Sequence, residues 1–252
     1  MQKIEVFDFN VHLTLDGTFK DYKRNMPSAF STWQNTKFFL PIGGNVCGIH
    51  GIGNYRPHEF LKLVVSCGRD FIATLPWTFD FTAEINPILK HRAVKILKLH
   101  PCSLNKSIFD FDYLKIIETC KVNSLAFGLC TFVGDRNLDQ QEIELMRKIV
   151  RNCMSQRVSI VFFHAFGLDF SRLWCEFGES EFVYFETSFS VVRYREAFTK
   201  PLAKILEGNP KNVIFGSDYP DYSLDEIFAH IPPEVLANER FLKSNAVESF
   251  VR

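Results

Sequence analysis

The sequence lacks several features that mark whole classes of protein. No apolar stretch approaches the roughly 18 residues of a membrane-spanning helix, and no basic region followed by an apolar run opens the chain. Lys+Arg and Asp+Glu both number 29, so no excess of one charge favours nucleic acid or an anionic membrane. We therefore expect a small-molecule substrate, no nucleic-acid partner and no membrane partner. The sequence also allows a homo-oligomer.

Paired cysteines are missing as well. The seven cysteines are scattered singly, with no CxxC pair and an odd total. This pattern favours reduced thiols, and hence a cytoplasmic protein, over a disulfide framework. The 252 residues are 46% hydrophobic and show no internal linker, which predicts a single domain over residues 1–252.

What the sequence does contain is a regular alternation of short apolar runs and helix-length segments. Within 138–153, for example, Ile143, Met146 and Val150 fall three to four residues apart and give one apolar helix face. Strands that alternate with helices imply parallel βαβ units. The eight apolar runs are IEVFDFNV (4–11), NVCGIHGI (45–52), FIATLPW (71–77), VKILKLH (94–100), SLAFGLCTF (124–132), VSIVFFHAF (158–166), FVYFETS (182–188) and NVIFGSD (212–218).

Eight such units at this length predict an α/β fold, a (β/α)8 TIM barrel. The rival is a doubly wound open sheet, but no GxGxxG follows the first run, and polar side chains stand there instead. Active sites of barrels lie at the C-terminal strand ends. The polar residues near those ends are Asn10, His12, His50, Lys98, His100, Cys130, Thr131, His164, Glu186, Thr187, Ser188, Ser217 and Asp218.

Each of these residues also has a purely structural interpretation. An Asp such as Asp218 after an apolar strand often caps the next turn, although it also suits a base or a metal ligand. His164 fits a satisfied core histidine or a site residue. Cys130 fits a small buried hydrophobe or a thiolate ligand. Lys98 would face inward if Leu97 and Leu99 face the helices, where it would anchor a substrate carboxylate or pair with a carboxylate of the barrel.

Six segments together resemble the amidohydrolase-related metal-dependent hydrolases (amidohydrolase 2), the branch that includes aminocarboxymuconate-semialdehyde decarboxylase. They are FDFNVHL, KILKLHP, VSIVFFHAFG, VYFETS, VIFGSDYP and SNAVESF, and FGSDYP is the most specific part. The resemblance implies an amidohydrolase-like barrel with one metal ion, usually zinc. Two first-strand histidines, a fifth-strand histidine and the eighth-strand Asp would hold the ion. A sixth-strand histidine would act on the metal-bound water or the substrate.

The departures from this family pattern fall on the metal ligands. Asn10 stands where the first histidine is expected, and Cys130 falls on or beside the fifth-strand histidine, while His12, His164 and Asp218 remain. The resemblance thus assigns His12, Asp218 and, as a substitute, Cys130 to the metal. An amide oxygen is a weak zinc donor, so we expect a divalent metal such as zinc to be bound weakly or not at all.

These residues lead to two hypotheses of function. In the first, the chain is an amidohydrolase-like hydrolase or decarboxylase-type lyase that acts on a small carboxylate or carbonyl substrate. Asp218 and His164 would be catalytic, and Lys98, His100 and Asn10 would bind the substrate. In the second, the chain is a catalytically silent barrel that serves as a binding or assembly protein. Several polar groups in an apolar barrel mouth favour the enzyme.

Overall fold

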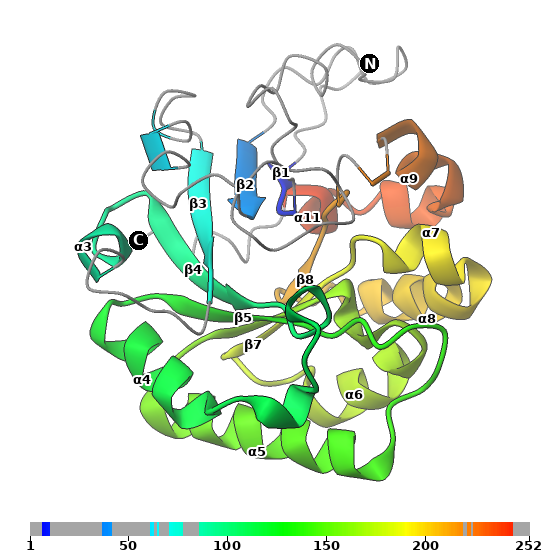
Figure 1. Cartoon of the computed structure of the whole chain (residues 1–252). Coiled ribbons are helices and arrows are strands. Elements are labelled where there is room, and N and C mark those ends of the chain that lie inside the picture. Colours follow the sequence, from blue (N-terminus) through cyan, green and yellow to red (C-terminus); the bar gives the residue numbers. More distant parts are fainter. Residues whose placement is uncertain are drawn as a thin grey trace.

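The structure, a computed structural model, describes residues 7–10, 37–41, 61–62, 65, 71–77, 86–218, 221–222 and 224–243. Its centre is an eight-stranded sheet in which every neighbouring pair is parallel and the strands follow the order of the chain (Figure 1). The strands are β1 (Phe7–Asp8), β2 (Lys37–Pro41), β3 (Phe71–Pro76), β4 (Val94–Leu99), β5 (Ala126–Cys130), β6 (Ile160–Phe163), β7 (Val183–Glu186) and β8 (Val213–Ile214).

Hydrogen bonds between the first and last strand segments close this sheet into a barrel. The backbone N–H of Phe9 donates to the carbonyl of Phe215 at 3.1 Å, and the N–H of Asp218 donates to the carbonyl of Asn10 at 2.7 Å. A doubly wound open sheet has no such contact between its ends. The predicted (β/α)8 TIM barrel is therefore confirmed.

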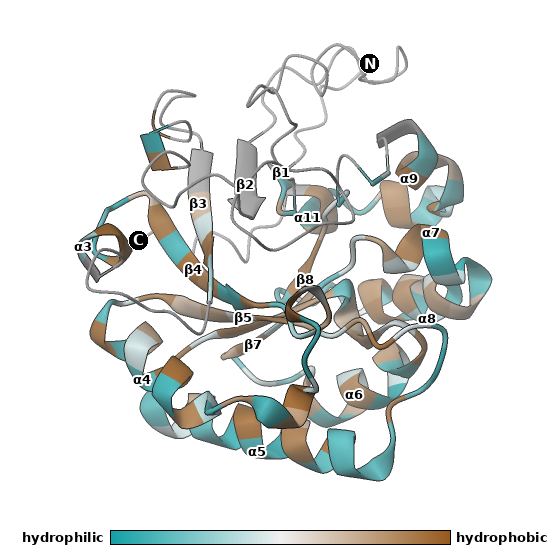
Figure 2. Ribbon diagram, viewed as in Figure 1, coloured by the Kyte–Doolittle hydropathy of each residue, from teal (hydrophilic) through white to brown (hydrophobic). Residues whose placement is uncertain are grey.

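Helices lie outside the strands, as the helical periods in the sequence predict (Figure 1). Residues on α4, α5 and α6 alternate between hydrophilic and hydrophobic, as expected for helices with one face on the sheet and one in water (Figure 2). The helices are α3 (Asn86–Leu89), η2 (Cys102–Leu104), η3 (Ile108–Asp110), α4 (Tyr113–Val122), α5 (Gln140–Gln156), η4 (His164–Asp169), α6 (Phe170–Phe177), α7 (Ser190–Tyr194), α8 (Glu196–Glu207), α9 (Leu224–His230), α10 (Pro233–Leu236) and α11 (Glu239–Lys243).

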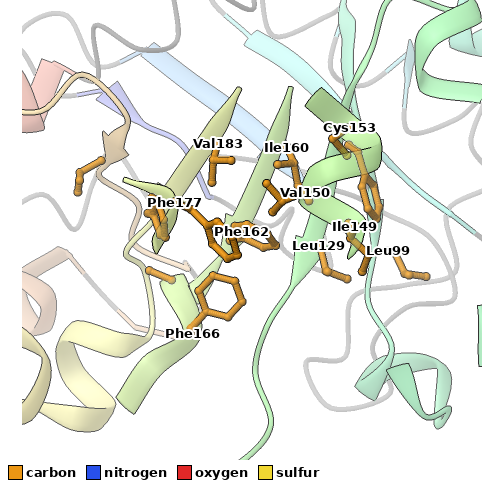
Figure 3. Packing of buried hydrophobic residues seen from close by; sticks show 14 of the residues in the cluster. Leu99, Leu129, Ile149, Val150, Cys153, Ile160, Phe162, Phe166, Phe177 and Val183 are labelled. Atoms are coloured by element: carbon orange, nitrogen blue, oxygen red, sulfur yellow. The ribbon is translucent and has the colours of Figure 1, made fainter. Parts of the chain in front are cut away.

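Two hydrophobic clusters fill the barrel and its surroundings. The larger one lies between strands and helices, where side chains such as Leu99, Leu129 and Phe162 meet Ile149 and Val150 of α5 (Figure 3). The smaller one fills the barrel interior and consists of Phe9, Ile96, Ala126, Val161, Phe163, Tyr184 and Ile214. Alternation along each strand separates the two sets, because successive side chains point to opposite faces. The polar residues at the C-terminal strand ends therefore lie next to an apolar barrel interior.

The second strand of the barrel is not the segment that the sequence predicts. The structure places Lys37–Pro41 between β1 and β3, whereas the predicted second strand, 45–52, lies outside the described residues together with its His50. Both runs are short and apolar, and Pro41 ends the true strand. Run length and composition alone do not choose between two neighbouring candidates of this kind.

Two further observations concern the whole described chain. No helix within the described residues is long and apolar enough to cross a membrane. The described cysteines Cys102, Cys120, Cys130, Cys153 and Cys175 are all free. The segment 244–250, which resembles the family's terminal helix, lies outside the described residues.

Candidate functional site

The side-chain amide of Asn10 links three polar groups at the C-terminal end of the barrel. Its Nδ2 lies 2.7 Å from Asp218 Oδ1, 2.6 Å from Ser188 Oγ and 3.3 Å from Glu186 Oε2. Turning the amide over would place its oxygen against the Asp218 carboxylate, so Asp218 favours the present orientation, in which Asn10 Oδ1 has no hydrogen-bond partner among the described residues. Asn10 thus bridges two carboxyl groups that come from neighbouring strands.

The Glu186 carboxyl is fully buried, as are Asn10 and Ser188. Its oxygens accept hydrogen bonds from the Ser188 N–H at 2.6 Å and the Ser188 hydroxyl at 2.8 Å. Gly216 makes room for it, because a Cβ at that position would lie 2.2 Å from Glu186 Oε1. Burial raises the pKa of Glu186 to about 8, the Ser188 N–H opposes this rise, and the nearby Asp218 charge adds to it. The pair of carboxyls therefore holds a proton at neutral pH.

Several residues around the site have left-handed backbone conformations. His164, Phe189 and Asp218 have φ values of 66°, 62° and 63°. In η4 the next residues after His164 continue with positive φ, up to Gly167 at 52°. Non-glycine residues adopt this region at a cost in free energy, and such residues concentrate at functional sites. The strand ends are therefore turned sharply where the polar side chains meet.

Lys98 faces the barrel interior, as the alternation along β4 predicts. Its neighbours Leu97 and Leu99 pack in the outer cluster, while Lys98 Nζ lies 3.9 Å from the centroid of the Phe163 ring inside the barrel. The residue is 1% exposed, and within the described part of the chain it belongs to no salt bridge. A cation–π contact in a desolvated place stabilises the ammonium group. Of the two interpretations of Lys98, pairing with a described carboxylate is therefore not realised.

Cys130 ends β5 beside two histidines. One potential ligand atom each of His100, Cys130 and His164 lie within 4.8 Å of one another. Burial raises the pKa of the Cys130 thiol to about 12, and the positive charge of Lys98 lowers it against this trend. The group is thus a neutral thiol in the absence of an ion.

Of the ligand set implied by the family resemblance, the structure describes Asp218 and Cys130. Asn10 donates an amide hydrogen to Asp218. A residue that shared a metal ion with the Asp218 carboxylate would instead have to direct a lone pair toward that ion. Cys130 lies with His100 and His164. His12 lies outside the described residues.

The predicted site residues thus separate into two adjoining groups. Asn10 and Asp218 meet in the carboxyl cluster, and His100, Cys130 and His164 form the second group. The positive charge of Lys98 acts on both groups, because it lowers the pKa of Glu186 and of Cys130 against the effect of burial. His164 also touches the first group, because its Nδ1 lies 3.3 Å from Ser188 Oγ. The sequence places Glu186 and Ser188 among the polar strand-end residues, but it does not indicate a role for either of them. Their alternation in VYFETS after a buried strand was the available signal.

Comparison with known proteins supports the fold. No protein-family model and no curated protein matches the chain. Among solved structures, a probable 2-pyrone-4,6-dicarboxylic acid hydrolase from Acinetobacter baumannii with citric acid bound has a TM-score of 0.65 at 11% identity, over 98% of this chain and 99% of that one. Dihydroorotase from Campylobacter jejuni has a TM-score of 0.59 at 16% identity, over 98% and 83%. An uncharacterised TIM-barrel protein from Bordetella bronchiseptica has a TM-score of 0.58 at 14% identity, over 97% and 98%.

One of these neighbours is named as a TIM-barrel protein, and another is named as a hydrolase. At such low identity the likeness establishes the common barrel, while function has to be argued from the site. The chain is therefore a (β/α)8 barrel with a buried polar cluster at its C-terminal strand ends.

Proposed function

We propose that the chain is an amidohydrolase-like hydrolase or decarboxylase-type lyase that acts on a small carboxylate or carbonyl substrate. The observation that carries the proposal is the pair of carboxyl groups, Asp218 and Glu186, bridged by the Asn10 amide at the C-terminal end of the barrel. Both residues are at most 4% exposed. Two buried carboxyls of unlike protonation are the usual equipment for acid–base catalysis.

The roles of the two carboxyls follow from their surroundings. Glu186, with a pKa of about 8, holds a proton at neutral pH and can donate it. Asp218 accepts a hydrogen bond from Asn10, which favours its carboxylate form and suits a base. In hydrolysis Asp218 would take a proton from the attacking water, and Glu186 would protonate the leaving group. In decarboxylation Glu186 would protonate the carbon that keeps the electron pair when carbon dioxide leaves.

Lys98 is the candidate anchor for the substrate carboxylate. Its ammonium group is buried and near the carboxyl cluster, since its charge lowers the pKa of Glu186. An anion placed beside a desolvated ammonium gains more than it would in water. The solved neighbour named as a dicarboxylic acid hydrolase contains citric acid, which supports a small carboxylate as the substrate class here. His164 and His100 would line the same space.

A metal ion, where one is bound, would polarise a substrate oxygen or activate water. The acid–base roles above belong to the chain's own residues. Asn10 donates a hydrogen bond to Asp218 and offers no lone pair there. We therefore propose that the ligand set implied by the family resemblance, including His12, binds a divalent metal weakly or not at all.

Asp218→Asn is the direct test of this function. The wild-type protein is screened against lactones, dicarboxylates and aromatic carboxylates, with acid release and carbon dioxide release recorded separately. We expect Asp218→Asn to abolish turnover, because the amide cannot take a proton, while the melting temperature stays close to that of the wild type. The matched control is Asp135→Asn, which removes an exposed carboxylate that pairs with Arg193 and should leave turnover unchanged. A folded Asp218→Asn protein with full turnover would remove Asp218 from the mechanism.

The second candidate is a catalytically silent barrel that binds a ligand or a partner. One observation favours it: the Asn10 amide nitrogen ties Asp218, Glu186 and Ser188 into an internal network, and internal networks of this kind also serve stability, although Asn10 Oδ1 has no hydrogen-bond partner among the described residues. This candidate predicts no turnover on any panel member.

A further inference from the structure

A second group of chemically active side chains adjoins the carboxyl cluster. His100 directly follows β4, Cys130 ends β5 and His164 directly follows β6. These strands are consecutive neighbours in the sheet, so their C-terminal ends bring the three side chains to a common centre. One ligand atom from each lies within 4.8 Å of the other two. We propose that His100, Cys130 and His164 form a metal site for a borderline-soft ion such as Zn²⁺, with a ligand set that differs from the one implied by the family resemblance.

The donor set decides which ions the site would take. Two imidazoles and one thiolate suit Zn²⁺ and Co²⁺, whereas Mg²⁺ and Ca²⁺ require oxygen ligands. Ligand atoms around tetrahedral zinc lie about 3.3–3.8 Å apart, so the three side chains would have to close by about 1 Å. A fourth position would remain for water or a ligand.

Neighbouring groups orient two of the three ligands. His164 Nδ1 lies 3.3 Å from the Ser188 carbonyl oxygen, so a proton on Nδ1 donates to that oxygen and the lone pair is then on Nε2. The hydroxyl of Ser190 donates to the His164 carbonyl at 2.5 Å and fixes the backbone there. At Cys130 the backbone N–H of Phe132 faces the sulfur, a contact that favours a thiolate ligand.

The site does not depend on the proposed reaction. Neither Asn10 nor Asp218 belongs to it, and an ion would bind whether or not the protein turns over a substrate. When the ion binds, the sulfur–metal bond replaces the S–H bond, and the proton leaves to solvent or buffer. The imidazoles donate neutral lone pairs, and no atom changes its oxidation state.

Cobalt titration tests the site directly. The full-length protein is reduced, stripped with a chelator and titrated with Co²⁺ while its near-ultraviolet and visible spectra are recorded. We expect one equivalent of Co²⁺ to produce a thiolate-to-cobalt charge-transfer band together with intense visible bands of tetrahedral cobalt. Zn²⁺ should displace Co²⁺ and remove both. A wild-type protein that gives no thiolate band at saturating Co²⁺ would overturn the proposal.

Variants assign the ligands. Cys130→Ser should remove the thiolate band and weaken binding at least tenfold, whereas the matched control Cys175→Ser changes an exposed cysteine and should leave the spectrum unaltered. His100→Gln, at a half-buried position, should weaken Co²⁺ binding and the visible bands. This variant tests the ligand set if Cys130→Ser does not fold. Asp218→Asn should keep the thiolate band. A band that survives Cys130→Ser, or that is lost in Asp218→Asn while the protein remains folded, would contradict this ligand set.

Discussion

The buried surroundings of Glu186 disfavour the charged form of its carboxyl group. Its pKa in the folded protein, about 8, exceeds the ordinary value of 4.5, so the folded state holds a proton that the unfolded state has already lost at intermediate pH. The sign follows: this group stabilises the folded state least at high pH, and its contribution declines as pH rises from about 4.5 to about 8.

We therefore expect Glu186→Gln to flatten the decline in the free energy of unfolding between about pH 5 and pH 9. The neutral amide no longer carries the charge that burial disfavours. Urea unfolding at a series of pH values measures this. Glu118→Gln, on the exposed side of α4, is the matched control and should leave the pH profile as it is in the wild type. An unchanged decline in Glu186→Gln would show that another group titrates in this range.

The sequence predicted which way the side chains of β4 point, but it did not predict which polar residues contact one another. Alternation along β4 places Lys98 inward and Leu97 and Leu99 outward, and the structure agrees. The sequence does not tell that Asn10 donates to Asp218, because that contact joins residues 208 positions apart. For the same reason the sequence does not show that Cys130 lies beside His100 and His164, while its place in a ligand set with Asp218 stays a prediction.

The η4 turn (His164–Asp169) is the element that aims His164 at the mouth of the barrel. Gly167 in this turn has φ of 52° and ψ of −114°, and a Cβ there would lie 2.4 Å from Cε2 of Tyr194. Gly134 offers a natural comparison: its φ is 82°, but a Cβ would meet nothing within 4 Å. The pair separates the cost of backbone conformation from the cost of crowding.

We expect Gly167→Ala to lower the free energy of unfolding by roughly 2–5 kcal/mol, the sum of backbone strain and overpacking. Gly134→Ala should lower it by about 1–2 kcal/mol, the conformational part alone. Denaturant unfolding of both variants provides the comparison. If the two variants lose the same stability, Tyr194 moves aside without cost, and the turn is not rigidly packed.

Elements with a strong period were predictable, and short ones were not. α5 (Gln140–Gln156) buries Ile143, Met146 and Val150, the residues whose spacing predicts it. Its start also follows local chemistry, since Asp139 and Glu142 form a capping box. β2 is five residues long and ends in Pro41, and a segment of that length has no period to distinguish it from its neighbour 45–52.

At the scale of the molecule, the order of eight parallel strands was predictable because the alternation of strand and helix permits few topologies. From the sequence, closure of the sheet into a barrel is inferred only from the number of βα units and the length of the chain. The structure shows the hydrogen bonds that close it. Besides the backbone contacts between β1 and β8, the Asp8 carboxylate accepts from the Ser217 N–H at 2.9 Å and from the Asn10 N–H at 3.4 Å. Asp8 is fully buried, so the bond from Ser217 joins the ends of the barrel without competition from water, while the bond from Asn10 holds the Asp8 side chain locally.

Asp8→Ala should therefore weaken the seam between the first and last strands more than it weakens the rest of the barrel. The change leaves the buried Ser217 N–H without this acceptor, which costs about 1–3 kcal/mol. Amide hydrogen exchange should accelerate at β1 and β8, while α5 (Gln140–Gln156) keeps its protection, because local opening precedes global unfolding. Asp8→Asn is the matched variant, since its amide oxygen can still accept from Ser217, and it should recover most of the protection. Equal acceleration in β1, β8 and α5 would mean that Asp8 supports the whole fold and that the seam opens no sooner than the rest of the barrel.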